Sequence, residues 1–262
     1  MKGYAGKPNK RMEKMGRKIS LIIPAYNEEE RLGETLDDYI SYFSYLCTDG
    51  FEVIVVCNGC DDNTPEIAAK YSQKFHQMIA LNISDKIGKG GAIKEGFKIA
   101  SGDIIGFVDA DGAIKPDETW KLLQIVSQGY DGAIGSRWLP GSQVLAKKPL
   151  RWRLASRAWN LLVRLFFQLP FKDTQCGAKT FERHVIQSVI NDFQINGMTF
   201  DVGLLWKATK QGYKIKEVPI IWEHKHKEGL TNNLYKTIIK MAIEIMKLRF
   251  KPLSKDGNGI NT

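Results

Sequence analysis

The sequence predicts an α/β fold in which a mostly parallel β-sheet is covered by helices on both faces. Short apolar runs rich in β-branched residues alternate with longer segments of helical periodicity through the first half of the chain. This alternation is typical of parallel sheets, whose strands are joined by crossover helices. The chain has 262 residues, 43% of them hydrophobic and 26% charged, so it is long enough to bury one large core.

The elements are expected in alternating order. Each expected strand is a short apolar run, and each expected helix carries apolar residues three and four positions apart. The expected strands are Ile19–Ile23, Phe51–Cys57, Met78–Ile83, Ile104–Val108 and Gly132–Ile134. The expected helices are Glu29–Tyr45, Pro65–Phe75, Gly90–Ala100 and Pro116–Val126.

The chain divides into a tail, a main domain and a C-terminal helix. Residues 1–18 are rich in Lys, Arg and Gly and lack the apolar core of a signal peptide, so we expect a basic tail. The main domain is expected over residues 19–228 and includes an amphipathic segment at 150–169, and residues 229–262 are expected to form an amphipathic helix and tail. No window approaches the roughly 20 apolar residues needed to span a bilayer. We therefore expect a cytosolic or peripheral protein.

The positive charge of the chain is concentrated in one segment. The formal net charge is +9. From Arg137 to Lys172 there are eight Lys and Arg residues and no Asp or Glu. This segment predicts an anionic partner, which can be a nucleic acid, an anionic membrane surface or a phosphorylated substrate.

Polar side chains follow the expected strands at the points where each strand ends. Parallel sheets bind ligands at the carboxyl ends of their strands, so these side chains are candidates for a shared site. They are Pro24, Tyr26 and Glu28 after the first strand, Asn58 after the second, Lys89 after the third, and Asp109 and Asp111 after the fourth.

Asp109 and Asp111 are the strongest candidates for chemistry. They stand two positions apart, directly after the apolar run Ile104–Val108. Carboxylates placed in this way can hold a divalent cation with oxygen ligands, which would bridge them to a diphosphate. The sequence therefore predicts a metal site at the ligand edge of the sheet.

The loop around Lys89 differs from the better-known phosphate loops. It lacks the G-x-x-x-x-G-K-[ST] spacing, which argues against a Walker-type ATPase. No G-x-G-x-x-G follows the first strand, which argues against a dinucleotide dehydrogenase. What remains is a cationic loop leading into a helix whose N-terminal amides can meet anionic ligand atoms.

The strand-end motifs together resemble the family-2 glycosyltransferases with the GT-A fold. The motifs are Pro24-Ala25-Tyr26-Asn27-Glu28, Asn58-Gly59 through Thr64, Gly88-Lys89-Gly90 and Asp109-Ala110-Asp111. Later segments are similar to those of dolichyl-phosphate sugar synthases, and most similar to the dolichyl-phosphate glucosyltransferase branch. These segments are Gly135-Ser136-Arg137, Asp173 through Lys179, and Phe200-Asp201 through Val218-Pro219.

The resemblance implies transfer of a hexose from a nucleotide diphosphate sugar to a polyprenyl phosphate, with inversion at the anomeric carbon and with Mg²⁺ or Mn²⁺ as cofactor. It places Asp109 and Asp111 at the metal and Lys225 at the donor phosphate. The remaining donor-binding residues that it implies are Pro24, Tyr26 and Glu28 in the nucleoside-binding loop, and Asn58, which stands where the family usually has a base-reading Asp.

Two amphipathic segments can serve the acceptor side. If Leu150–Gln168 forms one helix, its arginines fall on one face and Leu and Trp residues fall on the other. Such a helix can lie in a membrane interface, and packing against the core is the alternative. Leu234–Phe250 has a similar pattern. We expect peripheral attachment to the cytoplasmic face of a membrane, directly or through a membrane-protein partner.

The acceptor phosphate is expected to bind arginines, because a guanidinium pairs with phosphate oxygens through two hydrogen bonds. The candidates are Arg137, Ser156 and one of Arg153 and Arg157. A phosphate nucleophile is already anionic near pH 7, so Asp201 would then orient the substrate. If the acceptor is a hydroxyl, Asp201 becomes the candidate general base.

Two alternative functions would each explain some of the sequence features. A glycosyltransferase acting on a saccharide or another non-lipid acceptor would share every donor motif, and differs only in having no use for the basic amphipathic segment. A nucleic-acid-binding protein would explain the net charge and leave the strand-end carboxylates unexplained. We therefore expect no nucleic-acid partner.

Overall fold

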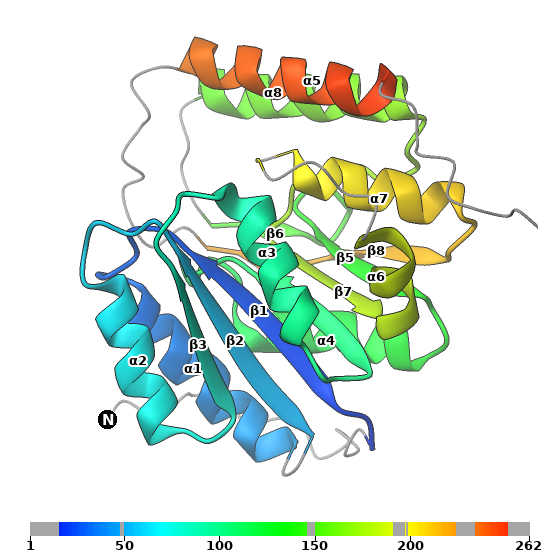
Figure 1. The fold of residues 1–262 in the computed structure, drawn as a ribbon. Helices are drawn as coiled ribbons and strands as arrows, with labels where there is room; N and C mark the ends of the chain where they lie inside the picture. Colours follow the sequence, from blue (N-terminus) through cyan, green and yellow to red (C-terminus); the bar gives the residue numbers. More distant parts are fainter. Residues whose placement is uncertain are drawn as a thin grey trace, which may run out of the picture.

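A computed structural model describes residues 16–47, 50–145, 150–190, 197, 199–223 and 234–250. Its centre is a seven-stranded sheet with strand order β3-β2-β1-β4-β7-β5-β8 (Figure 1). β7 runs antiparallel to β4 and β5, and the other neighbouring pairs are parallel. The mostly parallel sheet expected from the sequence is thus confirmed. The strands are β1 (Ile19–Ala25), β2 (Phe51–Asn58), β3 (Met78–Ile83), β4 (Ile104–Val108), β5 (Gly132–Ser136), β7 (Ala178–Glu182) and β8 (Ile215–Pro219).

The helices and a small second sheet complete the described part of the chain. β6 (Gln143–Val144) and β9 (Ile221–Trp222) pair in parallel. The helices are α1 (Leu32–Leu46), α2 (Thr64–Lys74), α3 (Gly88–Ile99), α4 (Pro116–Ser127), α5 (Leu150–Phe167), α6 (Arg183–Ile190), α7 (Phe200–Lys210) and α8 (Leu234–Phe250). Residues 1–15 of the predicted tail and residues 251–262 lie outside the described residues, so the division into 1–18, 19–228 and 229–262 stays a prediction.

The predicted elements recur with shifted boundaries. β1 continues past Ile23 to Ala25, because Pro24 and Ala25 still pair with β2. Its pairing with β4 ends at Ile22, so Pro24 lies beyond the part of β1 that is paired on both sides, where a sheet tolerates proline. α1 begins at Leu32 and not at Glu29, because a turn comes first, in which the amides of Arg31 and Leu32 both donate to the Glu28 carbonyl.

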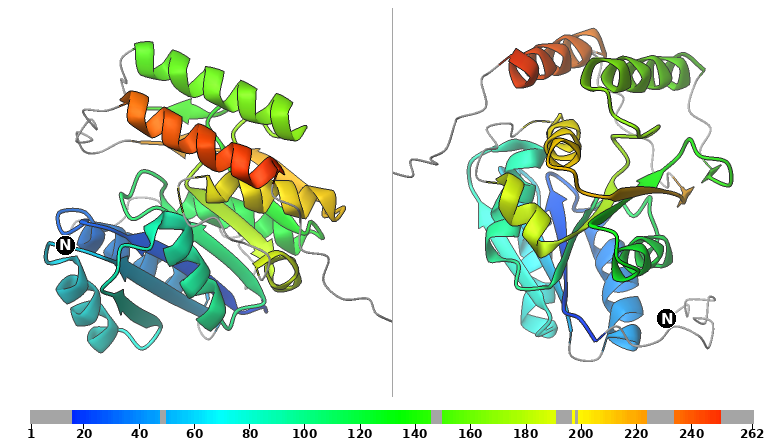
Figure 2. Two further views of the ribbon diagram at one scale, coloured as in Figure 1. Left: turned by 45° about the horizontal axis from the view of Figure 1, so that its top comes forward. Right: turned by 90° about the vertical axis from the view of Figure 1, so that its right-hand side faces the viewer.

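Two apolar cores pack on opposite faces of the sheet. Alternate residues of β1 supply both, since Leu21 and Ile23 belong to one core and Ile22 belongs to the other. α1, α2 and α4 cover the first face, and α3, α6 and α7 cover the second (Figures 1 and 2). The parallel strands are buried on both faces, which explains their continuous apolar sequences.

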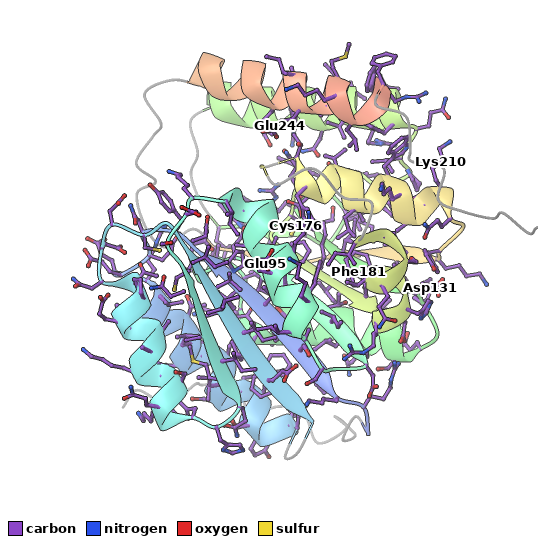
Figure 3. The ribbon with its side chains drawn as sticks, viewed as in Figure 1. Glu95, Asp131, Cys176, Phe181, Lys210 and Glu244 are labelled. Carbon is purple, nitrogen blue, oxygen red and sulfur yellow. The ribbon has the colours of Figure 1, made fainter. Side chains whose placement is uncertain are left out.

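α5 and α8 lie side by side over α7, at one end of the molecule (Figures 1 and 2). The Phe167 ring meets Trp206 of α7 edge-on at 5.3 Å between centroids, and Ile245 of α8 is 2% exposed. Thr199, just before α7, donates a 2.7 Å hydrogen bond from its hydroxyl to Glu244, which lies on the α7 side of α8 (Figure 3). The two amphipathic helices are therefore packed onto the second core.

The outer faces of the same two helices are apolar and exposed. Val163 and Phe167 of α5 are buried, so the core-packed alternative holds for one stripe of the helix. The opposite side presents a row of exposed apolar side chains. These are Leu161, Leu162 and Leu165 of α5, at 52–71% exposure, with Ile243, Met246 and Phe250 of α8. Among the described helices, none combines the length and hydropathy required to cross a bilayer.

The close packing of α3 on β1 predicts a large effect of a small substitution. A Cβ added at Gly96 would lie 2.6 Å from the Ile22 side chain, so Gly96→Ala should destabilise the protein by about 1–3 kcal/mol through overpacking. The matched control is Gly33→Ala in α1, where the new methyl group would have only an ordinary 3.7 Å contact. Urea denaturation of both variants checks this, and equal stability of the two would contradict the packing assignment.

Candidate active site

The loops that follow the first two strands are tied together at one edge of the sheet. The Asp61 amide donates to the Asn27 side-chain oxygen at 2.9 Å, and the Glu28 amide donates to the Thr64 hydroxyl at 2.7 Å. Asn27 accepts this bond in a left-handed conformation with φ of 54°. These bonds join the loop after β1 to the loop after β2, so the predicted nucleoside-binding residues share one rigid rim.

The predicted nucleoside-binding residues occupy this rim. Tyr26 is 37% exposed, and the Lys86 ammonium lies 3.7 Å from the centroid of its ring, a cation–π contact. Asn58 is 3% exposed and donates from its amide nitrogen to the Ala25 carbonyl at 3.0 Å. Pro24 lies within the β1–β2 pairing just before them. Tyr26 is therefore the accessible member of the group, and Asn58 also holds the end of β1 in place.

Asp109 and Asp111 leave the end of β4 beside Lys89 and Gly177. The Lys89 ammonium lies 2.6 Å from Asp109 Oδ1. Ala113 donates its backbone amide to Asp111 Oδ1 at 3.0 Å. A Cβ at Gly177 would fall 2.1 Å from Asp109 Oδ2, so only glycine leaves room for this carboxylate. The predicted strand-end cluster is thus assembled around Asp109.

Two members of this cluster, Lys89 and Asp111, have shifted pKa values. Burial favours the neutral amine of Lys89, but Asp109, Asp201 and Asp111 outweigh burial and raise its pKa. Burial and the neighbouring Asp109 charge raise the pKa of Asp111. Asp201 acts on Lys89 together with the two metal candidates, so it belongs to the same site.

The cluster fits a divalent cation. Burial beside Asp109 disfavours the charged form of Asp111, and a bound cation would relieve that repulsion. The Lys89 ammonium already lies against Asp109 as a counter-ion. Within the described residues, no group of three or more His, Cys, Asp and Glu side chains has metal-binding geometry. A metal held by Asp109 and Asp111 would therefore take its other ligands from substrate oxygens and water.

Glu28 lies close enough to the two aspartates to respond to their charge. Burial raises the pKa of Glu28 to about 7, helped by Asp111 and Asp109 and opposed by Arg31. The Arg31 guanidinium makes a 2.5 Å ion pair with the Glu28 carboxylate one turn away. Glu28 is thus a largely buried acid at the rim of the site whose charge changes near neutral pH.

Asp201 is held by a buried lysine. The Lys179 ammonium lies 2.6 Å from Asp201 Oδ1 and donates to the Cys176 carbonyl at 2.7 Å. The side chain of Lys179 is 0% exposed and that of Asp201 is 5% exposed, so water does not screen the pair. Because the Asp201 carboxylate already has a cationic partner, it is better suited to orienting a substrate than to accepting a proton as a general base.

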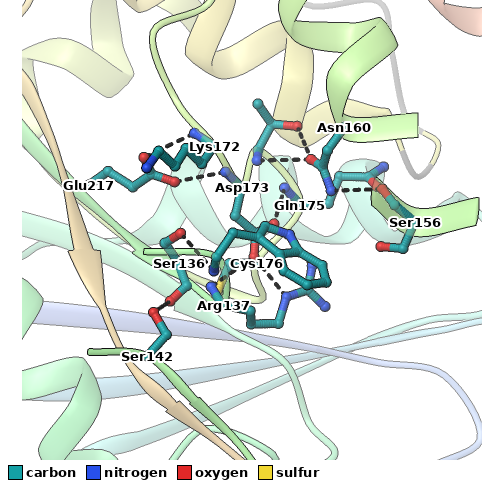
Figure 4. A network of polar contacts seen from close by, with 12 residues as sticks. Ser136, Arg137, Ser142, Ser156, Asn160, Lys172, Asp173, Gln175, Cys176 and Glu217 are labelled. Atoms are coloured by element: carbon teal, nitrogen blue, oxygen red, sulfur yellow. Dashed lines mark hydrogen bonds and ion pairs between the residues drawn. The ribbon is translucent and has the colours of Figure 1, made fainter. Parts of the chain in front are cut away.

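Arg137 makes a buried, bidentate pair with Asp173. Its Nε and Nη2 atoms donate to the Asp173 carboxylate at 2.7 and 3.0 Å, and its backbone amide donates to the same group (Figure 4). The pair outweighs burial and lowers the pKa of Asp173, which is 0% exposed. Asp173 is fixed in turn by Glu217, which accepts its backbone amide at 2.7 Å. An acceptor phosphate at Arg137 would have to share it with Asp173.

The other predicted acceptor residues are spread along α5. The Arg157 guanidinium stacks on the Trp138 ring at 5.1 Å, and Arg137 lies 5.9 Å from the same ring. Ser156 is partly buried and its backbone carbonyl accepts from Asn160 at 3.2 Å. Arg153 lies on the described backbone of α5, but its side chain lies outside the described residues, as does Lys225. Their roles stay predictions.

Sequence reasoning did not assign three residues of this site. Lys179 and Asp173 belong to a segment with family resemblance, yet a pattern does not show which acid a lysine will meet 22 positions away. Arg31 carries a local signal, because it stands three positions after Glu28 in a turn leading into a helix. The two long-range pairs, Arg137–Asp173 and Lys179–Asp201, become visible only once β7 is placed beside β5 and α7 is packed on the sheet.

The raised pKa of Glu28 predicts a pH-dependent loss of stability in the metal-free protein. The folded state binds this proton more tightly than the unfolded chain, so stability is lost as pH rises from about 4.5 to 7. Glu28→Gln removes the titration and should raise the free energy of unfolding at pH 8 relative to the wild type, with little gain at pH 5. Urea denaturation in EDTA at both pH values tests this, and an equal difference at both would refute it.

The Arg137–Asp173 pair predicts a double-mutant result. Arg137→Gln leaves the Asp173 carboxylate buried without its partner and should cost about 3–5 kcal/mol. Adding Asp173→Asn removes that charge and should restore much of the loss. Denaturation of the single and double variants measures the coupling, and a double variant no more stable than Arg137→Gln would rule out the pairing.

Comparison with known proteins identifies the family of the chain. The family model for glycosyl transferase family 2 matches residues 20–190. The chain is 35% identical to glycosyltransferase AglD of Haloferax volcanii, and the match covers 88% of this chain but 37% of that protein. It is 30% identical to the dolichyl-phosphate beta-glucosyltransferase of Saccharomyces cerevisiae, covering 88% of this chain and 74% of the relative.

Solved structures share the fold. Glucosyl-3-phosphoglycerate synthase from Mycobacterium tuberculosis, crystallised with Mn²⁺, UDP-glucose and phosphoglyceric acid, has a TM-score of 0.67 at 20% identity, with 94% of this chain and 84% of that chain covered. A second structure of that enzyme, with Mn²⁺, UDP and phosphoglyceric acid, covers 98% of this chain and 88% of that chain, with a TM-score of 0.67 at 18% identity. The expected GT-A fold is thereby confirmed, and the chain belongs to glycosyl transferase family 2.

Proposed function

We propose that this glycosyltransferase moves a hexose from a nucleotide diphosphate sugar to a polyprenyl phosphate, with inversion and with Mg²⁺ or Mn²⁺. The observation that carries the proposal is the position of Asp109. The Lys89 ammonium lies 2.6 Å from its carboxylate, and the charge of that carboxylate helps Asp173 to raise the pKa of Arg137, the first residue of the basic segment, against the effect of burial. A donor diphosphate at Asp109 would therefore lie next to the basic segment expected to bind an anionic acceptor.

Charge on the donor diphosphate is the main quantity that the site must stabilise during transfer. A divalent cation held by Asp109 and Asp111 would neutralise the charge that develops on the leaving diphosphate. Lys89 lies at 2.6 Å from Asp109, close enough to contact the same phosphate oxygens. Lys225 is proposed as a further cation for this group. Tyr26 and Asn58 are proposed to hold the nucleoside at the rim.

The acceptor needs little activation if it is a phosphate. A phosphate monoester is anionic near pH 7 and attacks without a general base. Asp201, held by Lys179, is then proposed to orient sugar hydroxyls. Arg157, Ser156 and Arg153, together with Arg137, are proposed to bind the acceptor phosphate. For a hydroxyl acceptor, Asp201 would have to give up its ion pair with Lys179 to accept a proton.

The exposed apolar faces of α5 and α8 support a membrane-bound acceptor. Leu165 and Phe250 are 71% and 68% exposed, and cationic side chains of the same helices, Arg157 and Lys247, are exposed as well. This combination suits a surface that rests on anionic lipid. We propose peripheral attachment on the cytoplasmic face of a membrane, with or without a membrane-protein partner.

The experiment that tests this function measures label transfer into an organic-extractable product. The protein is incubated with radiolabelled UDP-glucose or GDP-mannose, with Mg²⁺ or Mn²⁺, and with or without dolichyl phosphate. Lipid-phase label that requires both acceptor and metal is the expected result, and the productive donor identifies the sugar. Donor hydrolysis without lipid product would retain the glycosyltransferase and reject the lipid acceptor, and phosphoglycerate would then be the first soluble acceptor to try.

Asp109→Asn is predicted to reduce transfer by about 10²- to 10³-fold while the protein remains folded. The substitution keeps the shape that fits beside Gly177 and removes the charge that holds Lys89 and a metal. The control is Glu66→Gln, which neutralises an exposed carboxylate on α2. Electron paramagnetic resonance of Mn²⁺ gives a second readout, because Asp109→Asn should also weaken Mn²⁺ binding. Full turnover by Asp109→Asn would remove the metal assignment.

A further inference from the structure

A pocket of about 240 Å³ opens beside α5, apart from the strand-end carboxylates. Its volume is several times the roughly 30 Å³ that one water molecule occupies in the liquid, so it can hold a larger group. Neither Asp109 nor Asp201 contributes to its wall. The lining residues are Trp138, Arg157, Asn160, Leu161, Arg164 and Lys172.

The pocket wall carries positive charge without a lining acid. Arg157, Arg164 and Lys172 are cationic, and no lining residue is acidic. The carboxylate beside Lys172 is that of Glu217, which already accepts backbone amides of residues 172 and 173 at 2.9 and 2.7 Å (Figure 4). A cationic pocket of this kind favours an anion that offers several oxygen acceptors.

Trp138 is the aromatic residue of the pocket wall. Its ring is one wall, with the Arg157 guanidinium stacked on it at 5.1 Å. Trp138 Nε1 is buried and has no hydrogen-bond partner among the described residues. A buried donor without an acceptor is costly, and an anion oxygen would satisfy it.

The position of the pocket indicates what carries the anion. Leu161 lines the pocket and is 54% exposed, and Leu162 and Leu165 extend the apolar row along α5. A phosphate bound in the pocket would thus have an apolar strip beside it that suits a hydrocarbon chain. Arg137 is committed to Asp173 and is not part of the lining. The pocket is therefore distinct from the Arg137 contact, and it shares Arg157 with the acceptor residues expected from the sequence.

We propose that the pocket formed by Trp138, Arg164 and Lys172 binds the phosphate group of a membrane lipid. The inference rests on the proposed function and deepens it, since the expected acceptor residue Arg157 is part of the pocket wall. Two kinds of lipid carry such a phosphate group, namely a polyprenyl phosphate and an ordinary anionic phospholipid. Arg164 and Lys172 are the residues that this site adds to those expected from the sequence.

The test is flotation of the full chain with vesicles, without donor and in EDTA, so that transfer plays no part. The vesicles contain phosphatidylcholine alone, phosphatidylcholine with phosphatidic acid, or phosphatidylcholine with dolichyl phosphate at matched lipid charge. The test variant is Arg164→Gln with Lys172→Gln. The control is Lys70→Gln with Lys74→Gln, which removes the same charge from exposed positions of α2, far from α5 (Figure 1).

The wild type should bind phosphorylated vesicles and ignore neutral ones, and the pocket variant should bind about tenfold more weakly or worse while the α2 control is unchanged. If the pocket variant loses binding to both kinds of phosphorylated vesicle, the pocket is a general lipid-phosphate site. If the wild type binds only vesicles with dolichyl phosphate and the pocket variant loses that binding, the pocket binds the acceptor. The exposed single variant Lys172→Gln, with a circular-dichroism melt, separates binding from misfolding.

Three outcomes would overturn the site. The first is that the pocket variant floats with the vesicles as the wild type does. The second is that the α2 control loses binding as much as the pocket variant, and the third is that the wild type shows no preference for phosphorylated vesicles. Because no donor is present, each of these outcomes is independent of the transfer assay. Failure of transfer with intact, Arg164-dependent lipid binding would reject the proposed reaction and keep the pocket.

Discussion

The antiparallel pairing of β4 with β7 is the contact on which the site depends. Its register sets Val108 opposite Ala178, so the chain leaving β4 meets the chain entering β7. The Asp109 amide donates to the Gly177 carbonyl at 3.1 Å, and the missing side chain of Gly177 makes room for the Asp109 carboxylate. Within β7, the Lys179 side chain reaches Asp201 at the start of α7. Within the sheet, this pairing joins the strands that end at the predicted donor-binding loops to the strands next to the basic segment.

Matched charges keep this junction stable before any substrate binds. Each cation at the centre has a carboxylate partner, as in the pairs Lys89–Asp109, Lys179–Asp201 and Arg137–Asp173. Buried pairs of this kind recover the cost of leaving water only when both partners are present. The pairs differ in accessibility, since Lys179 is fully buried whereas Lys89 and Asp109 are 25% and 36% exposed. The exposed pair is therefore the one that a metal and an anionic donor can rearrange, and the buried pair is structural support for it.

The sequence predicted the first half of the fold because each buried strand there is a plain apolar run followed by a polar turn. It did not predict β7, although that strand is central, because Lys179 and Thr180 interrupt its apolar pattern inside a largely buried strand. The closeness of the strand-end residues Asp109, Asp111 and Lys89 was predictable because the carboxyl ends of parallel strands meet at one edge of the sheet. The partnership of Arg137 with Asp173 was not, because the two stand 36 positions apart and neither belongs to a periodic pattern.

The amphipathic helices fit both interpretations of their sequence pattern, packing against the core and lying at a membrane interface. α5 uses Val163 and Phe167 to pack on the second core and still leaves Leu161, Leu162 and Leu165 in contact with solvent. A helix that only needed to be packed would present polar residues outward. Arg164 lies between the two surfaces, partly buried at the pocket edge. A long cationic side chain at such a boundary can keep its charged end at the level of lipid phosphates while its methylene groups cover apolar surface. The same helix therefore links the core that positions the reacting groups to the surface where a lipid phosphate would arrive.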